Sequence, residues 1–346
     1  MTKMLKEILE QPSVLGNVEK ANESTLKALV SELNERKVTH ATFAARGTSD
    51  HASIYGQYVL GKFKGVVSSL ALPSCITLYD GKLSLENDLV FGVSQSGKAA
   101  DALAVIEQGN AAGAVTVAIT NDETSPLAKQ AKYHLFCNAG LEESVAATKT
   151  FTSQMFLLGL VAAYWSNNSE FLAALREVPQ FAQQMLDTCQ DDIISKVPKF
   201  RFMKEGFVLS RGYSYAVALE AALKIQETCY IKMKGYAISD FYHGPLAQLD
   251  KDVPVIIFAN NGKIANDVKE IVAKVTEIGI DPLIVTNDIA LSEKKENTVL
   301  IPDTGCEATE AFLYAIFAQR FAECLSTSKN LCPDTPRLLK KVTITK

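Results

Sequence analysis

Two serines, a glutamine and a glycine follow an apolar stretch in the first third of the chain. Ser94-Gln95-Ser96-Gly97 comes directly after residues 89–93 and precedes a stretch with helical periodicity from Ala99. Hydroxyls, a glycine and the free N–H groups of a helix N-terminus together favour phosphate, because the helix dipole attracts negative charge. The alternative is a helix cap, since Ser is a preferred N-cap residue. Ser49, in another predicted strand-end loop, favours an anion site.

Acidic side chains at helical spacing are candidates for moving protons. Glu220, Lys224 and Glu227 lie four and three residues apart in the predicted helix 218–230 and therefore share one face. Cys229 follows closely, so we expect part of this face to be buried, and a partly buried carboxylate at Glu227 suits general base catalysis. For Glu220 the favoured alternative is a surface salt bridge with Lys224.

A histidine and a lysine could assist carbonyl chemistry. His243 lies in a predicted loop, 240–245, among aromatic residues, although a loop histidine is often a surface group. Near the C-terminus, Arg337, Lys340 and Lys341 favour a solvated basic tail, and the alternative is that a tail lysine forms an imine with a sugar carbonyl. Glu142 and Glu143 precede an apolar helix, where acids are also favoured simply by the helix dipole.

Composition limits the classes of function. The chain has 346 residues, 47% of them hydrophobic and 21% charged, which is typical of a folded protein with room for two domains. A net charge of -4 indicates no nucleic-acid partner. The longest apolar run, 155–165, is too short to cross a bilayer, and no signal peptide opens the chain, so we expect no membrane partner.

The histidines and cysteines also limit the cofactors and the cellular compartment that we expect. Four histidines show no metal-ligand spacing, so we expect neither a metal site nor another cofactor. Seven cysteines without a C-x-x-C pair fit a reducing compartment, and we expect a cytoplasmic protein.

An internal repeat organises the chain. Arg46-Gly47 and Arg211-Gly212 each follow an apolar stretch, and so do Gly97-Lys98 and Gly262-Lys263; the offsets are 211 − 46 = 165 and 262 − 97 = 165. The second half has Asn260-Asn261 where the first has hydroxyls, so we expect only the first half to bind phosphate.

Short apolar runs alternate with helical patterns in each half. In the first half we expect strands near 41–45, 66–71, 89–93, 115–119 and 134–137. This alternation predicts an α/β fold of two tandem doubly wound parallel sheets, whose ligands bind at the carboxyl ends of the strands. The expected divisions are a helical segment 1–37, domains 38–170 and 195–330, and a tail 331–346.

Six short motifs occur one after another along the chain. They are Arg46-Gly47-Thr48-Ser49-x-His51-Ala52, Ser94-Gln95-Ser96-Gly97, Glu142-x-x-Val145-Ala146-x-Thr148-Lys149, Ala218-Leu219-Glu220-x-Ala222-Leu223-Lys224, His243-Gly244-Pro245-Leu246-Ala247 and Pro336-Arg337-x-Leu339-x-Lys341. With them the chain resembles the sugar isomerase (SIS) domain family, which has a flavodoxin-like fold. It is especially similar to the isomerase part of glucosamine-6-phosphate synthase and to SIS-type glucosamine-6-phosphate deaminases.

The resemblance implies roles for individual residues. Gly47, Thr48, Ser49 and the loop Ser94, Gln95, Ser96 and Gly97 match phosphosugar-binding positions, and Val145 and Lys224 match positions beside the sugar. Glu227 matches the glutamate that moves a proton between C1 and C2. His243 matches the histidine that opens the sugar ring, often from a partner subunit, which implies a homodimer. Lys341 matches a lysine that forms an imine, with Lys340 as its rival because the register of the tail differs by one residue. The family's synthase has a threonine where this chain has Ala99.

The resemblance also implies a reaction. We expect deaminating isomerisation of glucosamine 6-phosphate to fructose 6-phosphate and ammonia, without glutaminase activity, since the chain begins Met1-Thr2-Lys3 and is short for a full synthase. The alternatives are an aldose–ketose isomerase of phosphosugars, a fructosamine-6-phosphate deglycase, and a phosphosugar sensor without catalysis.

Overall fold

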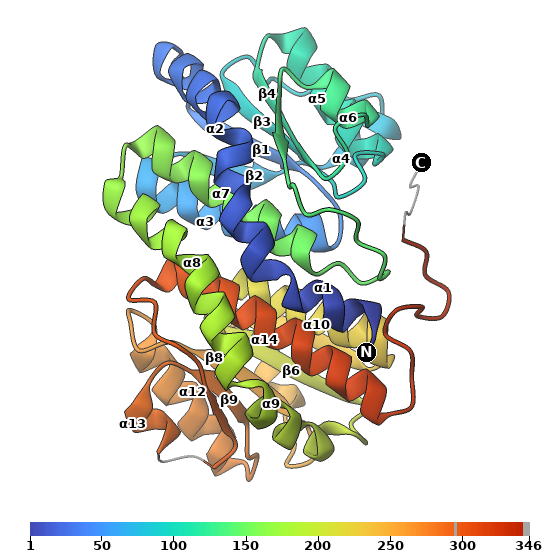
Figure 1. Ribbon diagram of the computed structural model, residues 1–346, viewed down its shortest axis with the longest axis vertical. Helices are drawn as coiled ribbons and strands as arrows, with labels where there is room; N and C mark the ends of the chain where they lie inside the picture. The colour runs from blue at the N-terminus through green and yellow to red at the C-terminus, as the bar shows by residue number, and fades with distance from the viewer. Residues whose placement is uncertain (294–295, 342–346) are drawn as a thin grey trace. The chain divides into compact units, whose positions relative to one another are not determined.

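The computed structural model of the chain divides into two compact units and describes residues 1–293 and 296–341. The β1–β5 unit contains Ser13–Glu142, Lys149–Arg176 and the tail from Lys340. The β6–β10 unit contains Met1–Pro12, Glu143–Thr148 and Glu177–Leu339. Each unit holds one sheet of five parallel strands with helices against it (Figure 1). The α/β fold class predicted from the alternating pattern is therefore confirmed.

The first seventeen elements in chain order begin with two helices. They are α1 (Lys3–Leu9), α2 (Gln11–Glu35), β1 (His40–Ala44), α3 (Thr48–Lys64), β2 (Val67–Leu70), α4 (Pro73–Thr77), β3 (Asp88–Val93), α5 (Ala100–Ala112), β4 (Val115–Thr120), α6 (Pro126–Gln130), β5 (Tyr133–Phe136), α7 (Lys149–Ser166), α8 (Ser169–Thr188), α9 (Gln190–Lys196), η1 (Val197–Phe200), β6 (Glu205–Ser210) and η2 (Gly212–Ser214). Each of the first five strands begins and ends within one residue of its predicted range.

The remaining elements complete the second sheet. They are α10 (Tyr215–Cys229), β7 (Lys232–Ala237), α11 (Ile238–Phe241), η3 (Pro245–Gln248), β8 (Val255–Ala259), α12 (Ala265–Glu277), β9 (Leu283–Thr286), α13 (Ile289–Ser292), β10 (Thr298–Leu300) and α14 (Glu307–Ser328). The predicted loop 240–245 is thus partly wrong, because Asp240 lies in the short helix α11. Of the predicted tail, residues 342–346 lie outside the described residues.

The two sheets share one topology. Their strand orders are β2-β1-β3-β4-β5 and β10-β9-β8-β6-β7, which match when the second is read in reverse. All strand pairs among the described residues are parallel, so the chain returns through a helix between neighbouring strands. The repeat predicted from the 165-residue offset is confirmed at the level of the fold.

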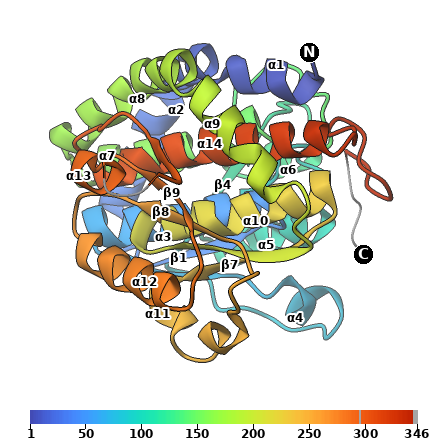
Figure 2. The ribbon, with the colours of Figure 1, turned by 90° about the horizontal axis from the view of Figure 1, so that it is seen from below.

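Helices cover both faces of each sheet, which explains the continuous apolar runs of the central strands. In the β1–β5 unit, alternate residues of β1 and β3 point to opposite faces: Phe43 stacks on Phe91, whereas Ala44 and Val90 pack with α5. In the β6–β10 unit, Phe258 stacks on Tyr314 of α14, and the opposite face of the sheet packs with α12 (Figure 2). The sheets are therefore buried and hold their strand ends rigidly.

A buried acid joins α14 to the loops after β9 and β10. Asn287 Nδ2 donates to Glu310 Oε1 at 2.7 Å, and Glu310 is only 2% exposed. Its Oε2 meets no donor, because the group beside it is the carboxylate of Asp303. Burial, and then the charges of Asp303 and Glu307, raise the pKa of Glu310 to about 8. Glu310 is therefore protonated at neutral pH and can donate to Asp303.

This raised pKa predicts a pH-dependent stability. An acid whose pKa rises on folding stabilises the fold fully below its unfolded value, near 4.5, and that contribution is lost as the pH rises towards 8. The loss amounts to about 1.4 kcal/mol per pH unit over this interval. Glu310→Gln carries a permanent N–H donor, so we expect it to be more stable than the wild-type chain by a few kcal/mol at pH 9 and nearly equal at pH 5.

Denaturant unfolding at the two pH values measures the difference. Glu277→Gln, at an exposed glutamate of α12, is the matched control and should follow the wild-type curve. If the free energy of unfolding of Glu310→Gln differs from that of the wild-type chain by the same amount at both pH values, the pKa of Glu310 is not raised in the folded state.

Candidate functional site

The strand order of the β1–β5 sheet places two loops beside its topological switch point. The chain leaves β1 and β3, which are neighbours, towards opposite faces of the sheet, and ligands of doubly wound sheets bind at the carboxyl ends of such strands. The loop after β1 ends at Gly47, the N-cap of α3, and Thr48 and Ser49 form the first turn of that helix, so the prediction that Ser49 lies in a loop is wrong. The loop after β3 contains Ser94–Gly97. The predicted anion-binding residues of the first half are therefore brought to one edge of the sheet.

The Ser94–Gly97 loop is an open cradle and not a helix cap. Helix α5 begins at Ala100, its N-cap is Ala99, and no side chain caps it. The hydroxyl of Ser94 instead accepts from the Gly97 N–H at 3.2 Å, within the loop. Within residues 1–293 and 296–341 the backbone N–H groups of Gln95 and Ser96 donate no hydrogen bond. The capping alternative is wrong, and two donors remain available for an anion.

Neighbouring loops hold the cradle in shape. The carbonyl of Gln95 accepts from the Asn121 N–H at 2.9 Å, and the carbonyl of Gly97 accepts from the Leu127 N–H at 3.1 Å. Gly97 has a φ of +62°, and a Cβ at this position would overlap the side chain of Ser125, which caps α6. The loop therefore requires glycine for two separate reasons.

Two polar contacts that the sequence pattern did not reveal fix the first turn of α3 and the loop that precedes it. Gln154 Nε2, from the middle of the apolar helix α7, donates to Ser49 Oγ at 3.1 Å. Arg46 Nε donates to Asp101 Oδ2 at 2.7 Å and so joins this loop to the first turn of α5. A glutamine inside an otherwise apolar helix was the available signal for the first contact.

The equivalent loop of the β6–β10 unit is already filled. Asn260-Asn261-Gly262 follows β8 as Gln95-Ser96-Gly97 follows β3. Here the carboxylate of Glu307, from the first turn of α14, accepts from the Lys263 N–H, and a Cβ at Gly262 would overlap it. The unit's own carboxylate thus occupies the place of an external anion, which fits the predicted asymmetry between the halves.

Helix α10 carries a buried lysine between two carboxylates. Lys224 Nζ lies 3.1 Å from Glu220 and 2.6 Å from Glu227 Oε2, and its side chain is 0% exposed. Burial alone would lower the pKa of Lys224, but the two carboxylates outweigh it and raise the pKa, so the ammonium persists. The predicted surface salt bridge of Glu220 is wrong: the pair exists, but Glu220 and Lys224 are both buried.

Glu227 combines a fixed position with access to solvent. Its side chain is 21% exposed, Oε2 is held by Lys224, and Oε1 has no hydrogen-bond partner among the described residues. A carboxylate oriented through one oxygen and open at the other can exchange a proton with a ligand. This geometry is what a proton-transfer role at Glu227 requires.

The other predicted site residues of the β6–β10 unit, His243 and Val145, have no hydrogen bond or ion pair with Glu227 among the described residues. His243 is exposed in the turn after α11, and its N–H donates to the Asp240 carbonyl. No hydrogen bond or ion pair in the described part of the chain joins it to Glu227. Val145 is half-buried, and its N–H donates to the Asp334 carbonyl at 3.3 Å.

The tail lysine has a defined partner in the β1–β5 unit. Lys341 Nζ donates to Glu142 Oε2 at 2.6 Å, whereas Lys340 is exposed. The spacing of residues could not reveal this pair, since 199 positions separate its members.

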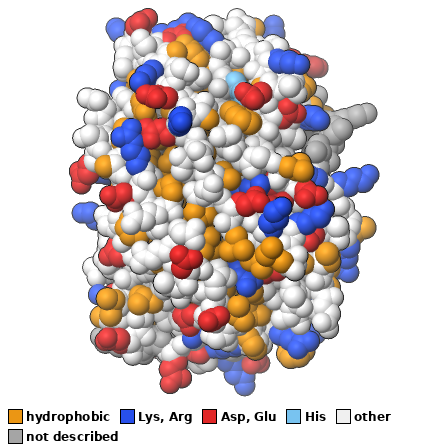
Figure 3. Space-filling model, viewed as in Figure 1, with side chains coloured by type: hydrophobic (Ala, Val, Ile, Leu, Met, Phe, Trp, Pro, Cys, Tyr) orange, Lys and Arg blue, Asp and Glu red, His pale blue; other side chains and the backbone are white. Residues whose placement is uncertain are grey.

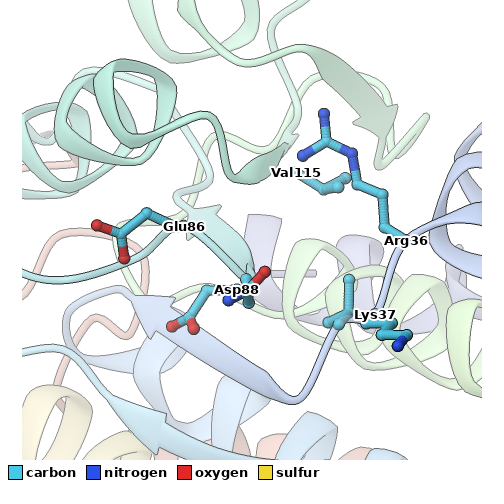
Figure 4. A pocket seen from close by; sticks show the side chains of 7 residues that line it. Arg36, Lys37, Glu86, Asp88 and Val115 are labelled. Carbon is cyan, nitrogen blue, oxygen red and sulfur yellow. The ribbon is translucent and has the colours of Figure 1, made fainter.

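A charged hollow at the other edge of the β1–β5 sheet is a weaker candidate. It has a volume of about 220 Å³, and Figure 4 shows Arg36 and Lys37 on one side with Glu86 and Asp88 on the other. Arg36 is already paired with Glu32, and Asp88 accepts from Thr42. The face in Figure 3 likewise intersperses basic with acidic side chains.

The described residues form neither a cluster of metal-ligating side chains nor a helix that could span a bilayer. No group of three or more His, Cys, Asp or Glu side chains could hold a metal ion. No helix there is long and apolar enough to span a bilayer.

The fold and the switch-point loops define a doubly wound α/β protein with a candidate anion cradle in one of two repeated halves. Residues 32–164 and 202–322 match the model of the SIS domain, so the chain belongs to the SIS domain family. The family predicted from the motifs is confirmed.

Known relatives share this fold along the whole chain. The glutamine–fructose-6-phosphate aminotransferase [isomerizing] of Aquifex aeolicus is 34% identical over 99% of this chain, which spans 57% of that relative. The C-terminal domain of glucosamine-fructose-6-phosphate aminotransferase from Francisella tularensis has a TM-score of 0.86, with 26% identity, and the match covers 97% of this chain and 98% of that domain. Glucosamine-6-phosphate deaminase from Thermotoga maritima has the same fold, with a TM-score of 0.79, 21% identity, and coverage of 99% and 100%.

Removing the buried ammonium should destabilise the chain strongly. Lys224→Met leaves the carboxylates of Glu220 and Glu227 facing each other, and breaking a buried ion pair from one side costs about 3–5 kcal/mol. Lys274→Met breaks an exposed pair with Glu277 and should cost less than about 1 kcal/mol. Equal losses of unfolding free energy in the two variants would contradict the buried network.

Replacing Gly97 should do more damage than replacing another glycine that has a positive φ but open space around it. Gly97→Ala adds a clash with Ser125 to the cost of a positive φ, so we expect a loss of stability of about 2–3 kcal/mol and weaker binding of phosphate esters. Gly113→Ala is the matched control: its φ is +77°, but its Cβ would meet open space. It should cost about 1 kcal/mol and leave ester binding unchanged. Calorimetric titration with a sugar phosphate measures the binding, and equal affinities in both variants would rule out the cradle.

Proposed function

We propose that the protein converts glucosamine 6-phosphate to fructose 6-phosphate and ammonia. The observation that carries this proposal is Glu227, which is oriented by the buried ammonium of Lys224 and keeps one oxygen open. The cradle of Ser94–Gly97 and Ser49 would bind the phosphate. Membership of the SIS domain family and the named activities of the relatives support the same class of substrate.

The reaction needs a proton to move between adjacent carbons. In the open-chain sugar, Glu227 would remove the proton from C2 and return it to C1, which leaves a hydroxymethyl group at C1 and an imine at C2. The C2–N bond then breaks, water supplies the oxygen at C2, and ketose phosphate and ammonia leave. Positioned acid–base catalysis of this kind contributes about 10²–10⁴-fold to a rate.

His243 and Lys341 would complete this chemistry. His243, exposed in its turn, would assist ring opening, and its exposure is compatible with action on the site of a second subunit in a homodimer. Lys341 Nζ would attack the C2 imine, expel ammonia and form a lysyl imine, which water hydrolyses to the ketose and the free lysine.

The test incubates the full chain with glucosamine 6-phosphate and measures ammonia and fructose 6-phosphate, which should appear in equal amounts. Glu227→Gln should lower kcat by about 10²–10⁴-fold while sugar-phosphate binding is retained, because the amide cannot accept the proton. Glu277→Gln, at an exposed glutamate, is the control and should be fully active.

Two outcomes would contradict the proposal. Absence of ammonia from glucosamine 6-phosphate and related amino-sugar phosphates would reject the deaminase, and interconversion of aldose and ketose phosphates would then identify an isomerase. Full activity in Glu227→Gln would reject the proton-transfer role.

A further inference from the structure

Glu142 is a carboxylate whose burial the proposed function does not explain. Its side chain is 0% exposed. Oε1 accepts from the Thr150 N–H at 3.1 Å, and Oε2 accepts from the Thr150 hydroxyl at 2.8 Å. Thr150 is the second residue of α7, so the carboxylate lies at the N-terminus of an eighteen-residue helix, where the helix dipole favours negative charge. Glu142 is thus rigidly held and shielded from water.

Glu142 Oε2 also contacts the tail lysine. Lys341 Nζ donates to it at 2.6 Å, and the lysine side chain is 24% exposed. The residues before it are exposed, Leu338 by 98% and Leu339 by 43%. The adjacent Lys340 is exposed as well. Contact with Glu142 therefore distinguishes Lys341 from its neighbour.

We propose that Glu142 is a positioning residue that holds the Lys341 ammonium and so selects this lysine, rather than Lys340, for reaction with the sugar carbon. This inference rests on the proposed function. A lysine side chain free in solvent samples many rotamers, and fixing it costs entropy. A charge-assisted hydrogen bond to a buried, immobile carboxylate offsets that cost before substrate arrives.

The ion pair is also compatible with nucleophilic attack. An ammonium cannot attack C2, so Nζ must first lose a proton, and Glu142 Oε2 is the acceptor already in contact with it. The transfer converts the ammonium and the carboxylate into an amine and a carboxylic acid, so the total charge of the pair stays at zero. No other reagent is required for this step.

The ion pair can be tested in the free protein. Trace acetylation of the full chain with acetic anhydride, followed by mass spectrometry of the tail peptide, compares Lys341 with Lys340 as an internal standard. In the wild-type chain we expect Lys341 to react at least about tenfold more slowly, the ratio that a charge-assisted hydrogen bond implies. Equal reactivity of the two lysines in the wild-type chain would overturn the proposal without any variant.

Variants then assign the protection to Glu142. Glu142→Gln should bring the two lysines to similar reactivity, and Glu142→Asp, which keeps the charge, should restore part of the protection. Glu143→Gln is the matched control, because the adjacent Glu143 is exposed and pairs with Lys3 instead. Undiminished protection in Glu142→Gln would overturn the proposal.

A double-mutant cycle tests the positioning role in catalysis. Glu142→Gln should lower kcat at least tenfold with little change in KM, Glu142→Asp should recover part of the loss, and Glu143→Gln should be unaffected. In a Lys341→Met background the Glu142→Gln change should cause no further loss, since Glu142 acts through that lysine. An equal loss in both backgrounds would overturn the positioning role.

The two levels of failure are distinguishable. If the wild-type chain releases no ammonia from amino-sugar phosphates, the proposed function and the positioning role fall together, while slow acetylation of Lys341 would still establish the ion pair. If ammonia is released and Glu142→Gln keeps the full rate, the positioning role alone is rejected.

Discussion

Parallel pairing of β1 with β3 is the constraint on which the candidate anion site depends. Parallel strands place all their carboxyl ends at one edge, and the chain must leave these two neighbours towards opposite faces. The two loops are thereby separated at the switch point, with their backbone N–H groups at the edge of the sheet. The buried faces around Phe43 and Phe91 keep the strands, and hence the loops, in register.

The same constraint acts in the second sheet with a different outcome. The loop after β8 has the same place in the topology, yet Glu307 supplies a carboxylate to the Lys263 N–H. Asp303 and Glu310 add further acidic groups nearby, and Glu310 is kept uncharged there by burial and by its neighbours. An external anion would meet a resident carboxylate in this half, whereas the Ser94–Gly97 loop keeps two N–H groups open. The repeated fold gives the loops after β3 and β8 the same position, and the side chains around each loop determine its charge.

Strand positions, and the place of the Ser94–Gly97 loop at the end of a strand, were predictable because they rest on local patterns. Apolar runs define buried strands, and the switch point follows from their alternation with helices. The burial of this face of α10 was not predictable from spacing. The four-residue interval placed Glu220 beside Lys224 but could not show that both side chains are inside the core. The start of α5 was predicted within one residue, but the capping alternative was wrong, because the hydroxyl of Ser94 bonds within its own loop and no side chain caps the helix. Pairs distant in sequence, such as Gln154 with Ser49, depend on tertiary packing alone.

The two lysine–carboxylate contacts differ in a way that follows from burial. Lys224 is fully enclosed between two carboxylates, so separating it from either would leave a charge unpaired, and its contact with Glu227 fixes the orientation of that carboxylate. Lys341 is partly exposed and has the buried Glu142 on one side and solvent on another. Its proton can therefore pass to Glu142 and its nitrogen can turn to a ligand without creating a buried charge. A fixed lysine suits orientation of a base, and a tethered but accessible one suits covalent chemistry.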